Sequence, residues 1–199
     1  MKQILRSLLI LLTFTAQGQN TIEWDKDYKL QFSDFQSPST QIGQTNVYSL
    51  YTGIHMDFAF HMSNTEFMFT KNFNSKVNCS LNKAAAYIIA ADNMKATELL
   101  NFAQYEFDLT ELYVRKFRQK MFANKGAFSN VNFFKPLYDK VQLELSSRHA
   151  SATKLTDMGG KSNLLNELHQ EVLDELTQLA DFCKTCKPPK RKKQSEVLD

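Results

Sequence analysis

Apolar and polar positions follow two different periods along this chain of 199 residues. Residues 47–69 show a period of two, which is typical of a strand with one buried face. The apolar members are Ile54, Met56, Phe58, Phe60 and Met62, and they alternate with His55, Asp57, Ala59 and His61. Because residues 63–65 can turn the chain into residues 66–69, we expect a hairpin here. Two short strands or extended pieces, 22–24 and 28–32, precede it.

The longest helical pattern begins at about residue 93 and continues to residue 121. Asp92 or Asn93 can cap its start, because a short polar side chain accepts a hydrogen bond from a free backbone N–H of the first turn. Acidic residues fill its earlier part and basic residues its end, which complements the helix dipole. Glu111 and Arg115 lie four positions apart and form a favourable pair on one face.

Shorter helical patterns surround this segment. The helical period starts at about residue 81, and a further piece spans residues 134–145. A polar loop containing residues 159–160, both glycine, separates that piece from a last helix capped by Ser162 or Asn163. The apolar stripe of the last helix consists of Leu165, Leu168, Val172, Leu176 and Leu179.

The first 18 residues have the pattern of a signal peptide. Residues 1–6 carry two positive charges, and the apolar run over residues 7–14 is too short to span a bilayer. Ala16 and Gly18 supply the small residues of a cleavage site, so we expect the mature chain to begin near Gln19, in the periplasm or outside the cell. The alternative is an ordinary buried amino-terminal helix. We expect no transmembrane segment, because no later run reaches about 18 apolar residues.

The remaining chain predicts one domain of the α+β class over residues 19–182. Roughly 180 residues remain without the leader, enough for one core, and 43% hydrophobic with 23% charged residues is a globular composition. We expect a small antiparallel sheet near the amino end, packed on a helical layer whose long central helix is residues 93–121.

Residues 183–199 form a basic tail that we expect to be disordered, because it has few residues to bury. The net charge of +3 includes this tail and the leader, so the folded body is near neutral and nucleic-acid binding has little electrostatic support. An alternative role for the tail is weak contact with an anionic surface, at about 1 kcal/mol per cation. Such contact would use Lys190, Arg191, Lys192 and Lys193.

Three cysteines, Cys79, Cys183 and Cys186, are too few for a four-cysteine zinc site and odd in number for full pairing. Cys183 and Cys186 could close a small disulfide in an oxidising compartment. They follow a helix carboxyl end, which disfavours a thiolate, so we do not expect redox catalysis.

Three segments carry a resemblance to a known family. They are Ile22-Glu23-Trp24, Leu30-Gln31-Phe32-Ser33-Asp34-Phe35, and the helix that begins Leu99-Leu100-Asn101-Phe102-Ala103-Gln104-Tyr105-Glu106-Phe107-Asp108. Over nearly the whole mature chain, the sequence resembles exported bacterial proteins of unknown function that are predicted to be zinc-dependent peptidases. In that family an Ile-x-Trp and a Leu-x-Trp-x-Asp-Phe segment precede a helix reading Leu-Leu-x-His-Glu-Gln-x-His-Phe-Asp. The resemblance implies a zincin-like fold.

The family's metal chemistry does not carry over. A His-Glu-x-x-His helix binds zinc through histidines one turn apart, and its glutamate activates a water. The matching positions here are Phe102, Ala103 and Glu106, and Met158 stands where the family's Thr-x-His-Gly would supply a third ligand. We therefore expect no catalytic residue, metal or cofactor, and interpret the chain as a non-catalytic pseudo-peptidase. Its partner would be an unknown protein or envelope component.

The main rival interpretation is an active secreted zinc peptidase with divergent ligands. Its donors would come from Glu106, His149, Asp157 or His169. We expect His149 in the polar loop and His169 on the last helix, neither with a partner at metal spacing. On the predicted strand, His55 and His61 would lie about 20 Å apart, too far to share one metal. His55 and Asp57 could form half a site, although solvated surface positions are the simpler interpretation.

Overall fold

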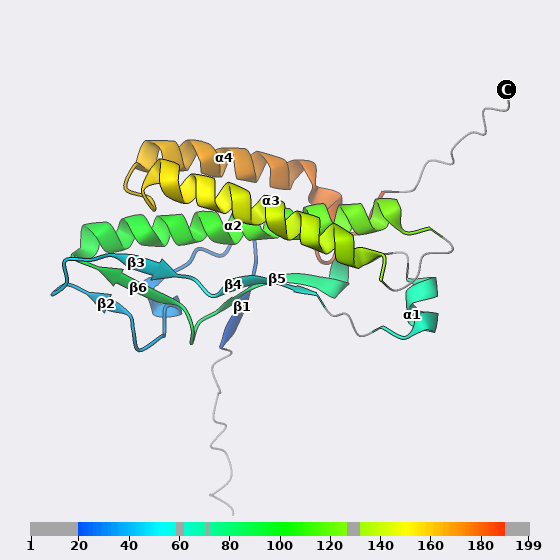
Figure 1. Ribbon diagram of the computed structural model, residues 1–199, viewed down its shortest axis with the longest axis horizontal. Coiled ribbons are helices and arrows are strands. Elements are labelled where there is room, and N and C mark those ends of the chain that lie inside the picture. The colour runs from blue at the N-terminus through cyan, green and yellow to red at the C-terminus, as the bar shows by residue number, and fades with distance from the viewer. Residues whose placement is uncertain (1–19, 59–61, 71, 127–131, 190–199) are drawn as a thin grey trace, which may run out of the picture.

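The computed structural model describes residues 20–58, 62–70, 72–126 and 132–189. In these ranges two small sheets lie on one side of a layer of long helices (Figure 1). The strands are β1 Thr21–Glu23, β2 Gln41–Ile42, β3 Ser49–Tyr51, β4 Ile54–Phe58, β5 Val77–Asn82 and β6 Tyr87–Ala90. The helices are α1 Asn64–Phe69, α2 Asn93–Asn124, α3 Phe134–Thr156 and α4 Ser162–Gln178, with short 3-10 turns at Phe32–Asp34, Asn74–Lys76 and Ala180–Phe182. The α+β class and the long central helix are confirmed.

The predicted single antiparallel sheet is two sheets. One has the strand order β1-β5-β4 and is antiparallel throughout. The other has the order β2-β6-β3, in which β2 runs parallel to β6 and β3 antiparallel to it. Val77 and Leu81 of β5 are fully buried against α2, so the first sheet supplies much of the core.

The hairpin predicted over residues 47–69 is wrong. β3 and β4 belong to different sheets and are separated by Thr52 and Gly53, where Gly53 has a positive φ of 61°. The alternation in β4 is real, but its partner is β5. Ser63 begins a helix because its Oγ accepts a 3.1 Å hydrogen bond from the backbone N–H of Glu66, a capping contact that favours α1 over a strand. Phe60 and His61 lie outside the described residues.

The helical period expected from residue 81 is also wrong, because residues 77–90 form β5 and β6. Short apolar runs cannot be assigned to helix or strand by periodicity alone. Ile88 and Ala90 of β6 are fully buried, and β6 contacts α2, so β6 connects the second sheet to the helical layer.

Helix α2 lies between the sheets and the helices α3 and α4, and it contacts both layers (Figure 1). It begins as predicted, since Asp92 Oδ1 accepts a 2.8 Å hydrogen bond from the N–H of Lys95. Apolar side chains are buried on both of its sides: Leu99, Phe102, Phe107, Leu109, Leu112, Phe117 and Met121. This two-sided burial makes α2 the centre of the fold.

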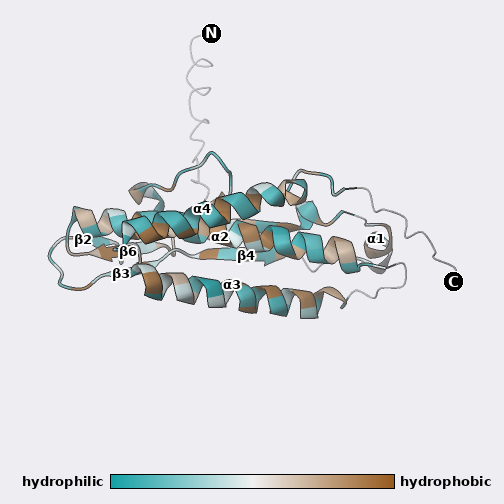
Figure 2. Cartoon of the chain, turned by 90° about the horizontal axis from the view of Figure 1, so that it is seen from above, coloured by the Kyte–Doolittle hydropathy of each residue, from teal (hydrophilic) through white to brown (hydrophobic). Residues whose placement is uncertain are grey.

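Helix α3 is longer than predicted and runs through residues 146–156, so His149 lies on a helix and not in a loop. The segment is rich in serine and threonine, which suggested a loop. Here the hydroxyls of Thr153 and Thr156 bond back to the carbonyls of His149 and Ala152, each at 2.8 Å. Hydrophilic and hydrophobic positions interleave along α3 and α4, as Figure 2 shows.

The turn between α3 and α4 packs directly on α2. Gly159 has a φ of +96°, and a Cβ at this position would lie 2.3 Å from the backbone oxygen of Glu98. Only glycine fits such an approach. Helix α4 starts at Ser162, so Lys161 takes the N-cap position expected for Ser162 or Asn163. Leu165, Val172 and Leu176 of the predicted stripe are buried, and Leu168 and Leu179 are half-buried.

Residues 183–186, which the sequence assigned to the basic tail, contact the folded body. Cys183 and Cys186 form a disulfide, and the carbonyl of Cys186 accepts hydrogen bonds from the side chains of Asn72 and Asn74, each at 3.0 Å. The predicted signal peptide and the basic cluster 190–193 lie outside the described residues. No helix in the described part of the chain is both long and apolar enough to cross a bilayer.

Candidate functional site

The motif positions on α2 form part of the core. Phe102 is 1% exposed and Ala103 is fully buried. The Phe102 ring packs against Tyr105 and His149, with centroids 5.8 and 5.9 Å apart. A phenyl ring has no lone pair for a metal, so these positions contribute packing and no ligand.

Glu106, one turn after Phe102, pairs with His149. The carboxylate contacts His149 Nε2 across the interface of α2 and α3, and the side chains are 15% and 39% exposed. The close contact with the Glu106 carboxylate raises the pKa of His149 above its usual value and outweighs burial, which lowers it. The sequence prediction missed this pair because it placed His149 in a loop.

A cleft of about 360 Å³ opens beside this pair. Its floor and helical wall come from α2 and α3, and its other wall comes from β3 and the link to β4. The lining residues are Leu50, Tyr51, Thr52, Gly53, Ile54, Glu106, Leu109, Thr110, Leu145, Ser146 and His149. β3 is an edge strand, because its only neighbour in the described sheet is β6. The cleft therefore has the Glu106–His149 ion pair on one side and an edge strand on the other.

Met158, the expected third motif position, lies in the turn that packs on α2. Its φ is 50°, and its half-buried side chain packs against the core. The neighbouring Gly159 lies so close to α2 that a Cβ there would be 3.4 Å from the Cβ of Phe102. The two motif segments are therefore adjacent in space, although they are far apart in sequence.

The donors of the rival interpretation fall into separate pairs. Glu106 pairs with His149, whereas Asp157 accepts a 2.8 Å hydrogen bond from the hydroxyl of Tyr48. His169 Nε2 lies 2.7 Å from Asp108 Oδ2. In the described ranges no three histidine, cysteine, aspartate or glutamate side chains are grouped so that they could hold a metal.

Asp108 is the centre of a buried polar network that sequence reasoning did not find. Its carboxylate accepts hydrogen bonds from Trp24 Nε1 at 2.7 Å and Gln104 Nε2 at 3.1 Å, besides the contact with His169. Burial raises the pKa of Asp108, but the three hydrogen-bonding partners outweigh it and hold the pKa below the usual value. Gln104 Oε1 in turn accepts from the N–H of Leu30. Two sequence features could have indicated this network: the tryptophan at position 24 and Asp108, the aspartate that ends the helix motif.

His55, Asp57 and Ser80 form a third polar group on the outer face of β4 and β5. His55 Nε2 lies 3.1 Å from Asp57 Oδ1, and Ser80 Oγ donates to Asp57 Oδ2 at 2.7 Å. Ser80 Oγ also lies 3.3 Å from the same Nε2, while Nδ1 faces the carbonyl of Gly53. A serine–histidine–aspartate relay needs both ring nitrogens, one for each partner. This group is therefore a surface network and not a catalytic triad.

Comparison of the chain with protein-family models, with curated proteins and with solved structures found no match.

Proposed function

We propose that the chain is an exported binding protein on a zincin-like scaffold, without peptidase activity. The observation that carries this proposal is the Glu106–His149 pair above buried Phe102. At the positions where a peptidase would hold its metal and base, Phe102 and Ala103 are buried in the core and Glu106 pairs with His149. The partner would be a protein or envelope component.

The residues present do not fit a zincin metal site. Such a site needs two nitrogen donors one turn apart, a third ligand, and a base. Phe102 and Ala103 offer neither donor nor base, and Met158 offers a thioether, which is a poor zinc ligand. The carboxylate of Glu106 is already bound to His149.

Two contacts support the alignment behind the resemblance. The backbone of Gly159 packs against Phe102, so the segments that would share one metal in an active relative are neighbours. Trp24 of the first resembling segment bonds to Asp108, the last residue of the helix motif. Both contacts join segments on which the resemblance depends.

The cleft beside Glu106 and His149 is the binding site that we propose. Leu50 and Tyr51 of the edge strand β3 line one wall, and an edge strand can pair with an extended segment of another chain through backbone hydrogen bonds. Tyr51, 53% exposed, gives this wall an aromatic surface. An extended segment of a partner protein therefore suits the cleft.

The Cys183–Cys186 disulfide supports export, because such bonds persist in oxidising compartments. It accords with the signal peptide that residues 1–18 predict. Amino-terminal sequencing of the protein from its native host tests this. A chain that starts near Gln19 in the exported fraction is expected, and an intact Met1 in a cytosolic pool would contradict it.

Elemental analysis combined with a peptidase assay tests the missing activity. The purified mature protein is expected to hold zinc far below one equivalent and to cleave no peptide in a mixed fluorogenic library. Stoichiometric zinc, removed by a chelator together with peptidase activity, would instead establish the rival metallopeptidase. Glu106→Gln is the matched variant, because it should change neither zinc content nor peptide cleavage in the first case and should weaken the metal site in the second.

A gain-of-ligand series tests the alignment itself. A triple variant restores the helix motif: Phe102→His, Ala103→Glu and Glu106→His. We expect stable zinc binding only when Met158→His is added, because the third ligand comes from the adjacent turn. Equal zinc content in the triple and quadruple variants, both folded by circular dichroism, would show that Met158 does not align with the third ligand.

A further inference from the structure

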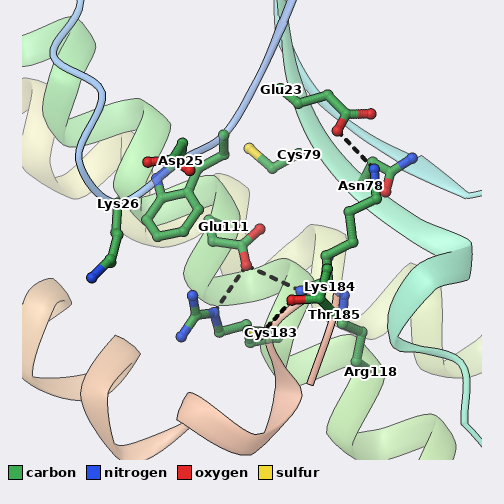
Figure 3. Close-up of a pocket in the computed structure, with 12 residues that line it drawn as sticks. Glu23, Asp25, Lys26, Asn78, Cys79, Glu111, Arg118, Cys183, Lys184 and Thr185 are labelled. Atoms are coloured by element: carbon green, nitrogen blue, oxygen red, sulfur yellow. Dashed lines mark hydrogen bonds and ion pairs between the residues drawn. The ribbon is translucent and has the colours of Figure 1, made fainter. Parts of the chain in front are cut away.

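A second pocket, of about 370 Å³, lies away from the cleft, between the sheet β1-β5-β4 and the carboxyl end of the described chain. Figure 3 shows Asn78 and Cys79 on its sheet side, Glu111 from α2 on its floor, and Lys184 with Thr185 on the opposite wall. Arg115 and Arg118 of α2 complete the floor. None of these residues belongs to the cleft described above.

The floor of this pocket carries a buried excess of positive charge. Glu111, Arg115 and Arg118 are 3%, 8% and 1% exposed. Both arginines share one oxygen, Glu111 Oε1, at 2.9 and 3.0 Å. One carboxylate thus faces two guanidinium groups, and a buried charge without a counter-charge is unfavourable. Burial lowers the pKa of Arg118, and Glu111 offsets this only in part.

The arginines also retain donors that no described residue uses. Arg118 donates to the backbone carbonyls of Val77 and Phe182, yet its buried Nε–H has no hydrogen-bond partner in the described part of the chain. Arg115 donates through Nε to Glu111 and through Nη1 to the carbonyl of Leu176, and its Nη2 has no described partner. Of these donors, the Arg118 Nε–H is the buried one, and a buried donor without a partner costs free energy unless an acceptor reaches it.

From this charge excess and these unused donors, we propose that the pocket binds a carboxylate, which pairs with Arg115 and Arg118. Guanidinium groups bind carboxylates through charge-assisted hydrogen bonds, and a carboxylate has two oxygens, one for the free Nε–H of Arg118 and one for the Nη2 group of Arg115. Trp24 lines the same pocket, with the Arg115 guanidinium 5.2 Å from its ring centre. The carboxylate comes either from a small organic acid or from the carboxyl terminus of a peptide. This site is independent of the function proposed for the cleft.

The pocket wall explains how the ligand would be enclosed. Cys183, Lys184 and Thr185 form it, and the disulfide with Cys186 fixes their backbone. Lys184 Nζ bonds to Glu23 Oε2 at 2.7 Å, so the wall is fastened to β1 at the rim (Figure 3). The rim also carries Lys26 and Asp25, and Lys26 Nζ lies 3.7 Å from Asp27 Oδ2, so the positive charge excess belongs to the buried floor and not to the entrance.

Fluorescence titration tests the proposal, because Trp24 is the only tryptophan of the chain and lines the pocket. Three probes separate the sources: propionate, N-acetyl-trialanine with a free carboxylate, and the same peptide with an amidated end. Saturable binding of propionate points to a small acid. Binding of the free-carboxylate peptide that is at least tenfold tighter than that of propionate points to a peptide terminus. In both cases the amidated peptide should not bind.

Two variants test the residues. Arg115→Lys keeps the charge but loses the Nη2 donor and the planar guanidinium, and it should weaken binding about tenfold. Lys26→Glu, at an exposed rim position, should weaken binding without risk to the fold, whereas Lys29→Glu makes the same charge change outside the pocket and should not. The proposal is overturned if no carboxylate probe binds, if the amidated peptide binds equally well, or if Lys29→Glu weakens binding as much as Lys26→Glu.

Discussion

The indole N–H of Trp24 donates a 2.7 Å hydrogen bond to the carboxylate of Asp108, 84 positions later in the chain. This bond fastens the segment after β1 to the middle of α2. Asp108 is 3% exposed, so each of its donors compensates for a buried negative charge.

Trp24→Phe should destabilise the protein. The ring remains apolar, but Asp108 loses one of its donors, and an unsatisfied buried acceptor costs about 1–3 kcal/mol. Urea unfolding followed by circular dichroism measures this. Tyr51→Phe is the control, because the Tyr51 hydroxyl has no hydrogen-bond partner in the described ranges, and it should change stability by less than about 0.5 kcal/mol. Equal effects would mean that the Trp24–Asp108 bond adds nothing.

Phe102→Ala should lower the free energy of unfolding by about 3–5 kcal/mol, because the ring is buried and leaves a cavity. Phe69→Ala, at a position 77% exposed, should have an effect below about 0.5 kcal/mol. Thermal and urea unfolding of both variants provide the comparison. A small effect at Phe102 would show that its pocket is not tightly packed.

Stability should fall as the pH rises through the pKa of His149. Its folded pKa is raised, so its ion pair with Glu106 stabilises the protein fully below the unfolded value of about 6.5 and is lost as the imidazole deprotonates. In Glu106→Gln the His149 pKa should move down toward its usual value, and this loss of stability should shrink. NMR titration of the His149 ring and urea unfolding at several pH values measure the two effects. A His149 pKa unchanged by Glu106→Gln would refute the ion pair.

Asp108 should make the protein less stable as the pH falls, whereas His149 makes it less stable as the pH rises. Its folded pKa is depressed, so its contribution is present above the unfolded pKa of about 3.9 and is lost as the pH falls through the lower folded value. Asp108→Asn should therefore flatten the acid limb of the stability curve while lowering stability at neutral pH. An acid limb as steep as that of the unmodified protein would mean that other carboxylates control it.

Gly159→Ala should destabilise the protein by more than the strain of a left-handed backbone alone. That strain is about 1–2 kcal/mol, and at Gly159 a Cβ would also meet the Glu98 oxygen at 2.3 Å. Gly43→Ala separates the two costs, because Gly43 has a φ of +87° with no atom within 4 Å of the added carbon. The difference between the two variants in urea unfolding measures the close approach. Equal losses would show that the turn can move away from α2.

Helix α2 could be predicted from the sequence because its signals are local. Asp92 caps the start, and the period persists over many turns. Residues 77–90 could not be assigned, because β5 and β6 are short and their pairing with β1, β3 and β4 depends on contacts distant in sequence. Residues 77–82 form a strand because β5 is buried against α2 and paired with β1 and β4, which the local periodicity does not reveal.

The candidate site was also predictable only in part. The sequence alone shows that Phe102 cannot ligate a metal, because a phenyl ring has no lone pair to donate. The sequence alone does not show that Glu106 pairs with His149, because His149 lies on a stretch of α3 whose serines and threonines favour a loop locally. Packing against α2 and α4 overrides that preference, and only then do Glu106 and His149 meet.

The ion pair between Glu23 and Lys184 brings the first strand and the last turn of the domain together, 161 positions apart in sequence. Joining two such neighbouring points with a short linker costs little chain entropy. The chain could then be opened at the exposed segment around Asn46, between β2 and β3, to give a circular permutant. The architecture therefore depends on which segments are neighbours in space, and the order in which the chain visits them could be changed while β1 stays beside β5 and Trp24 beside Asp108.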